Sequence, residues 1–142
     1  MIMPLPVDVE RALLARPAAR VRLHVVDGQR PIASFDDLAT EADLHRIGSE
    51  WREVDRDRAA EVLTHVLHRE MSYQVEVMPL NRANSLAQAL IAHCGGRARF
   101  ATNTEDMPGR SVWFPATDAT FDCGLLIIGD HARAVYWVED ED

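Results

Sequence analysis

Carboxylates are the groups with the clearest chemical potential in this sequence, and they gather towards its C-terminus. Asp118 and Asp122 lie at the start of an apolar segment, and residues 139–142 form the acidic run Glu-Asp-Glu-Asp. If the last two strands pair, these acids could converge to hold Mg²⁺ or Ca²⁺ or to serve acid–base catalysis. Two alternatives are a solvated run that keeps a hairpin soluble and a surface that binds a partner.

Histidine supplies a second candidate site, on one predicted helix. Glu61, His65 and His68 follow each other at spacings of four and three, which makes their side chains neighbours and potential metal ligands. The segment is not an HExxH motif, no further ligand is apparent, and the three residues lie off the apolar stripe of the helix. We therefore interpret them as a solvated helix face and predict no metal and no cofactor.

Motifs for nucleophilic or phosphate chemistry are missing from the sequence. There is no GxSxG turn, P-loop or GxGxxG turn. Cys94 and Cys123 are far apart, outside any CxxC pattern, and Cys123 falls in an apolar strand where its thiol would stay protonated. We predict two reduced core cysteines and a protein that is not an enzyme.

The charge of the chain is negative and unevenly distributed. The 142 residues have a net charge of −8, of which residues 102–142 contribute −7, because they contain nine acids against Arg110 and Arg133. Nucleic-acid binding would need a clustered excess of basic residues, so we predict no nucleic-acid partner. The acidic C-terminal region instead favours a basic protein partner.

Aromatic residues border this acidic region. Trp113 and Trp137 lie beside it, and Trp next to carboxylates is a typical composition of a protein-binding hot spot. The polar loop over residues 102–110 adds further acids. The predicted partner-binding residues are Glu105, Asp106, Trp113, Asp118, Asp122, Trp137, Glu139, Asp140, Glu141 and Asp142.

The elements that must position these residues follow from periodicity and from turn signals. Helices are predicted over residues 7–15, 35–45 with Ser34 as N-cap, 55–71, and from Pro79 to a stop at Gly95-Gly96. Strands are predicted over residues 20–26, 73–77, 97–101, 111–114, 119–128 and 134–138. Apolar residues on both faces of 119–128 place the latter half of that strand inside a sheet.

The fold class predicted from this order is α+β. We expect one domain over residues 1–142, with a mainly antiparallel sheet, two main helices packed on it and a C-terminal β-hairpin. The N-terminus lacks the regions of a secretory signal and no apolar run approaches the roughly 20 residues of a membrane span, so we expect a cytoplasmic protein without a membrane partner. All fifteen basic residues are Arg, which is typical of GC-rich bacterial coding. An exposed edge strand could pair two copies in a homodimer.

Two C-terminal segments carry a resemblance to a known class of proteins. Residues 113–124, Trp-Phe-Pro-Ala-Thr-Asp-Ala-Thr-Phe-Asp-Cys-Gly, and the closing Tyr136 to Asp142 resemble the small acidic α+β immunity proteins that neutralise bacterial polymorphic or secreted toxins. The resemblance covers the C-terminal third and transfers no functional residue. It implies an inhibitor of a toxin that acts in the cytosol. The alternatives are a small carboxylate- or metal-dependent hydrolase or transferase, and a regulatory subunit without chemistry.

Overall fold

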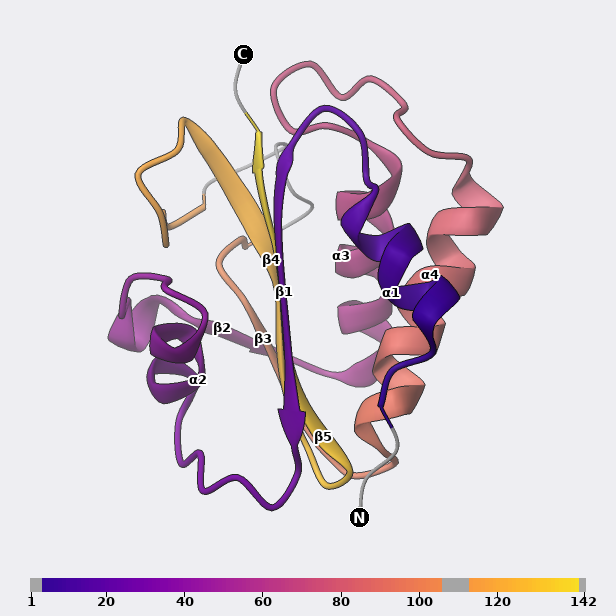
Figure 1. Cartoon of the computed structure of the whole chain (residues 1–142). Coiled ribbons are helices and arrows are strands. Elements are labelled where there is room, and N and C mark those ends of the chain that lie inside the picture. The colour runs from indigo at the N-terminus through magenta and orange to yellow at the C-terminus, as the bar shows by residue number, and fades with distance from the viewer. Residues whose placement is uncertain (1–3, 106–112, 141–142) are drawn as a thin grey trace.

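A five-stranded antiparallel sheet organises the chain (Figure 1). The computed structural model describes residues 4–105 and 113–140. The elements in chain order are α1 (Val7–Leu14), β1 (Arg20–Asp27), α2 (Phe35–Glu41), a 3₁₀ turn (Gly48–Glu50), β2 (Arg52–Val54), α3 (Arg56–His68), α4 (Leu80–Cys94), β3 (Ala98–Thr102), β4 (Phe121–Gly129) and β5 (Ala132–Asp140). The strands are arranged in the order β1-β5-β4-β3-β2, and each neighbouring pair is antiparallel. The predicted α+β class and C-terminal hairpin are confirmed.

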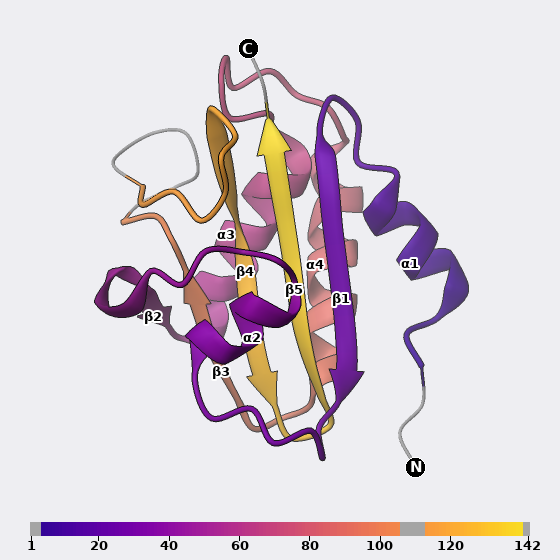
Figure 2. The same ribbon diagram turned by 60° about the vertical axis from the view of Figure 1, so that its left-hand side comes forward.

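Helices cover both faces of the sheet (Figure 2). The two main helices, α3 and α4, pack on one face together with α1, and bury Leu63, Leu90, Leu125 and Tyr136 among others. The short α2 packs on the opposite face over Trp137. Because each fully buried Leu side chain contributes about 1.5–3 kcal/mol, the larger helical face supplies most of the hydrophobic stabilisation.

Local signals fix the ends of these helices. The side chain of Ser34 accepts a hydrogen bond from Asp37 N at 3.1 Å, as predicted for the start of α2. The carboxylate of Asp55 accepts from Arg58 N at 2.8 Å and caps α3. At the end of α4, Gly95 has a φ of +109°, a conformation that residues with a Cβ rarely adopt.

The C-terminal hairpin forms the centre of the sheet. β4 lies between β5 and β3, as predicted from its apolar residues on both faces, and β5 lies between β1 and β4. The edge strands are therefore β1 and β2. The interpretation of the final acids as a solvated run that keeps the hairpin soluble is wrong for Asp140, which is fully buried.

Three strand predictions need correction. Residues 73–77 form a loop, with only an isolated bridge between Arg69 and Glu76. Trp113 forms an isolated bridge with Thr104 in place of a strand over 111–114, of which residues 111 and 112 lie outside the described residues. The strand β2, which pairs with β3, was not predicted because three residues carry too little alternation.

Candidate functional site

One end of the sheet brings together most of the predicted binding residues. We call it the β5 end: the end of the sheet where β5 finishes at Asp140 and β4 begins at Phe121, with the loops 15–19, 69–79, 103–105 and 113–120 (Figure 1). Of the ten predicted residues, Asp106, Glu141 and Asp142 lie outside the described residues. The other seven divide into buried, paired and accessible side chains.

Asp140 is a buried structural carboxylate. Its Oδ1 lies 2.7 Å from Nη1 of Arg16, and both side chains are fully buried. Its Oδ2 accepts a hydrogen bond from Met71 N at 2.8 Å. A carboxylate inside a protein must be paired in this way to offset the loss of hydration. The prediction that Asp140 contacts a partner is therefore corrected.

Asp122 is also inside the protein. Its carboxylate accepts hydrogen bonds from Thr117 N at 2.7 Å, Thr117 Oγ1 at 2.6 Å and Asn103 Nδ2 at 2.9 Å, and Ala116 N adds another. Burial raises the pKa of Asp122, while the bonds from Thr117 and Ala116 act in the opposite direction. The residue ties loop 113–120 to the sheet and presents no surface to a partner, contrary to the prediction.

Trp137 is the third correction. Its side chain is fully buried on the α2 face and meets Trp51 edge to face, with ring centroids 5.8 Å apart. Its Nε1 has no hydrogen-bond partner within the described part of the chain. Strand alternation directs Trp137 away from the helices α3 and α4 and into the cluster that contains Leu38 of α2 and Trp51.

The remaining predicted residues retain some surface. Glu139 is mostly covered and forms an ion pair with Arg22 at 2.6 Å. Glu105 is exposed and pairs with Arg52. The side chain of Asp118 is 99% exposed, with Oδ1 3.4 Å from Nε2 of His45.

Trp113 completes the accessible set. It is partly buried and packs against Phe121, with ring centroids 5.3 Å apart. Glu105, Trp113 and Asp118 thus flank residues 106–112 on loops at the same end of the sheet. Glu105 pairs with Arg52, Trp113 packs on the side of α3 and α4, and Asp118 lies next to His45, so the three keep separate local partners.

Sequence reasoning missed the loop between α3 and α4. Tyr73 and Val75 are 71% and 57% exposed there. The bond from Met71 N to Asp140 places the start of this loop at the β5 end, where Figure 1 shows the loop beside the end of β5. Residues 73–77 alternate polar and apolar residues as a strand does, so the sequence did not indicate an exposed loop.

The histidines of α3 have structural partners. His65 Nε2 is hydrogen-bonded to Gln74 Oε1 at 2.8 Å, and His68 is buried with Nδ1 2.7 Å from Met78 O. Both line a groove of about 600 Å³ along the seam of α3 and α4. Across residues 4–105 and 113–140, no three His, Cys, Asp or Glu side chains are arranged to hold a metal ion.

The cysteines are core residues, as predicted. Cys94 and Cys123 are fully buried and unbridged. Burial raises the pKa of each thiol to about 12, so both stay protonated near neutral pH. A protonated, inaccessible thiol is a poor nucleophile.

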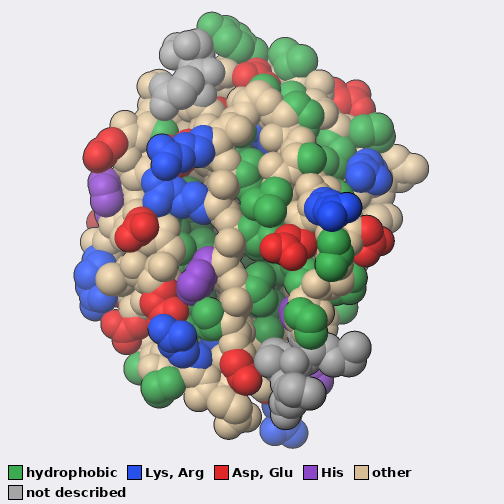
Figure 3. All heavy atoms as spheres, in the orientation of Figure 1, with side chains coloured by type: hydrophobic (Ala, Val, Ile, Leu, Met, Phe, Trp, Pro, Cys, Tyr) green, Lys and Arg blue, Asp and Glu red, His purple; other side chains and the backbone are tan. Residues whose placement is uncertain are grey.

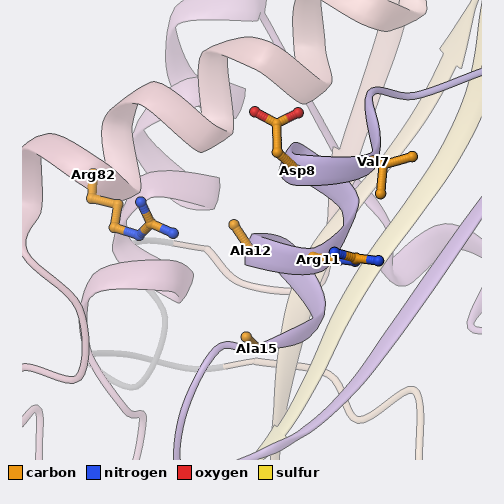
Figure 4. Close-up of a pocket in the computed structure, with 6 residues that line it drawn as sticks. All are labelled: Val7, Asp8, Arg11, Ala12, Ala15 and Arg82. Carbon is orange, nitrogen blue, oxygen red and sulfur yellow. The ribbon is translucent and has the colours of Figure 1, made fainter.

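A second depression of about 640 Å³ lies between α1 and α4 (Figure 4). Arg82 reaches from α4 towards Ala12, whereas the side chains of Asp8 and Arg11 point in other directions. Charged groups that do not converge cannot polarise one substrate atom. On the face that carries α1 and β1, basic side chains (blue) and acidic side chains (red) are interspersed (Figure 3).

Further comparisons add no assignment. Within the described residues, no helix combines the length and apolarity required to cross a membrane. Searches with family models, curated proteins and solved structures gave no significant match to this chain.

Proposed function

We propose that this protein is an immunity-type inhibitor, which binds and neutralises a basic bacterial toxin acting in the cytosol. The proposed contact surface is the β5 end of the sheet, around Glu105, Trp113 and Asp118. In this proposal the protein performs no chemistry of its own and acts by covering the toxin's active site.

The proposal rests on the contrast between the buried carboxylates of the β5 end, which serve the fold, and the side chains that stay exposed there. Asp122 and Asp140 are saturated by internal donors and serve the fold. The accessible groups are Asp118, Glu105 and the partly buried Trp113. A half-covered aromatic side chain at the same end of the sheet as exposed carboxylates supplies apolar contact area as well as charge, as binding hot spots do.

Charge supports a basic partner for this surface. Six of the nine acids in residues 102–142 are described by the structure; of these six, Asp122 and Asp140 are buried, and Glu139 is paired with Arg22. In the sequence, Asp106 follows Glu105, and Glu141 and Asp142 follow Asp140. A local acidic excess accelerates the capture of a positively charged protein and disfavours acidic competitors.

Co-expression tests the proposed function. Proteins encoded beside this gene are expressed one at a time in a bacterial host, with and without this chain. We expect one of them to stop growth alone, to be harmless with this chain, and to co-purify with it. If no neighbouring product is toxic or binds, the proposal is wrong.

Charge reversal tests the proposed surface. The variant Glu105→Arg/Asp118→Arg should bind the toxin about tenfold more weakly, mainly through slower association. Glu10→Arg, which reverses an exposed acid on α1, is the matched control and should bind as the wild type does. Equal affinities for all three proteins, measured by surface plasmon resonance, would place the contact elsewhere.

A further inference from the structure

The loop between α3 and α4 exposes two large apolar side chains, Tyr73 and Val75. Tyr73 is the most exposed large hydrophobic residue of the described chain, and Val75 stands two residues away. Isolated exposed apolar residues are common on protein surfaces and need no explanation. This pair differs because Glu70, Ser72 and Gln74 of the same loop form hydrogen bonds that brace it.

The carboxylate of Glu70 organises the loop. Its Oε1 accepts from Tyr73 N at 2.7 Å and Val75 N at 3.4 Å, and its Oε2 accepts from Ser72 Oγ at 2.6 Å. The backbone closes across the same residues, with Glu70 N donating to Val75 O at 3.0 Å and Gln74 N donating to Glu70 O at 3.1 Å. The two exposed side chains are thus carried on a backbone fixed by hydrogen bonds.

Gln74 anchors the tip to α3. It adopts a left-handed φ of +58°, which turns its side chain inwards to His65 at 2.8 Å and Met71 O at 3.2 Å. Arg69 Nη1 donates to Gln74 O. A loop held in one conformation before binding loses less conformational entropy in a complex, and Tyr supplies a large contact area with few rotatable bonds.

The surroundings define the chemistry of the partner. Met71 N binds Asp140, so the loop begins beside the end of β5, and the partly exposed Glu70 lies on the loop itself. Glu76, on the same loop, is exposed. Apolar side chains bordered by carboxylates complement an apolar pocket with a basic rim. A second copy of this acidic chain, or an anionic membrane, would meet charge repulsion here.

We infer that the Tyr73–Val75 pair is a second contact element of the inhibitor, which inserts into an apolar pocket beside the basic surface of the toxin. The inference rests on the proposed function, because it names a further part of the same interface. It assigns a binding role to a loop that lies apart from Glu105, Trp113 and Asp118 in the sequence and extends the contact surface across the β5 end.

Affinity measurements with a double variant test the inference. The probe is the purified toxin encoded beside this gene, inactivated in its active site. Tyr73→Ala/Val75→Ala should bind it at least about 30-fold more weakly, through faster dissociation. Leu14→Ala, an exposed apolar residue on α1, is the control and should retain wild-type affinity. Both variants should keep the wild-type melting temperature because the altered side chains are exposed.

Photo-crosslinking gives an independent readout in an otherwise unchanged protein. A photoreactive phenylalanine analogue at position 73 should crosslink to the toxin, and the same analogue at position 14 should not. Wild-type affinity of the double variant, or no crosslink from position 73, would overturn this inference and leave the proposed function standing. A wild-type chain that binds no neighbouring gene product would overturn both.

Discussion

At the scale of residues, the buried pair of Arg16 and Asp140 joins three distant parts of the chain. Arg16 follows α1 and donates to Val66 O at 3.0 Å and Arg69 O at 2.8 Å, while Asp140 ends β5 and accepts from Met71 N. The ion pair therefore fixes the end of β5 against α1 and the loop that carries Tyr73. It is a structural requirement of the β5 end and not a surface charge.

Removing one partner of this pair should be costly. Asp140→Ala leaves the Arg16 guanidinium buried without its counter-ion, and we expect the free energy of unfolding to fall by about 3–5 kcal/mol. Asp118→Ala removes an exposed carboxylate and should change it by less than about 0.5 kcal/mol. Urea denaturation followed by far-UV circular dichroism measures both. A midpoint for Asp140→Ala equal to that of the wild type would contradict the structural role.

For Asp140, the sequence predicts the direction of the side chain but not its ion-pair partner. Along β5, Tyr136 and Val138 face α3 and α4, and Asp140 continues this stripe by alternation. The inward direction of Asp140 was therefore predictable from the sequence. Its partner was not, because Arg16 lies 124 residues away and only the complete sheet brings the two together.

At the scale of elements, loop 69–76 depends on the ionised form of Glu70. Its hydrogen bond from Ser72 lowers the pKa of Glu70 below the usual 4.5, and the bonds from Tyr73 and Val75 act in the same direction. A carboxyl with a lowered native pKa stabilises the folded loop above pH 4.5. This contribution is lost as the pH falls through the native pKa.

Hydrogen exchange measures this dependence. The protection factors of the Tyr73 and Val75 amides, corrected for intrinsic exchange, should fall between pH 5 and about pH 3 as Glu70 becomes protonated. In Glu70→Gln they should be low at both pH values, because the ionised acceptor is missing. Amides in the centre of α4 serve as the internal reference. Equal protection of the loop at both pH values in the wild type would disprove the role of Glu70.

Local patterns predicted most helices and strands because short-range interactions decide them. Ser34, Asp55 and Gly95 mark helix ends through capping and backbone geometry, which the sequence states directly. The strand predicted over 73–77 was wrong because Gln74 adopts a left-handed conformation and Glu70 captures the amides that a neighbouring strand would need. Hydrogen bonds from backbone amides to a side chain do not change the alternation of polar and apolar residues, so the sequence pattern does not reveal them.

At the scale of the whole molecule, the sheet separates the groups that stabilise the fold from those that a partner can reach. The central strands β4 and β5 bury Asp122, Trp137 and Asp140, while the loops around them keep Asp118 and Tyr73 accessible. Composition predicted an acidic binding region near the C-terminus. It could not show how completely Asp122 and Asp140 are covered, because that depends on how α2, α3 and the loops pack on the hairpin.

The salt dependence of association tests the central proposal most directly. The rate constant for binding of the intact chain to its inactivated toxin is measured by stopped-flow fluorescence at increasing ionic strength. If an acidic β5 end captures a basic toxin, this rate constant should fall by about tenfold or more from low to high salt, with a smaller change in the dissociation rate constant. An association rate constant that is independent of salt, or that rises with it, would contradict the account.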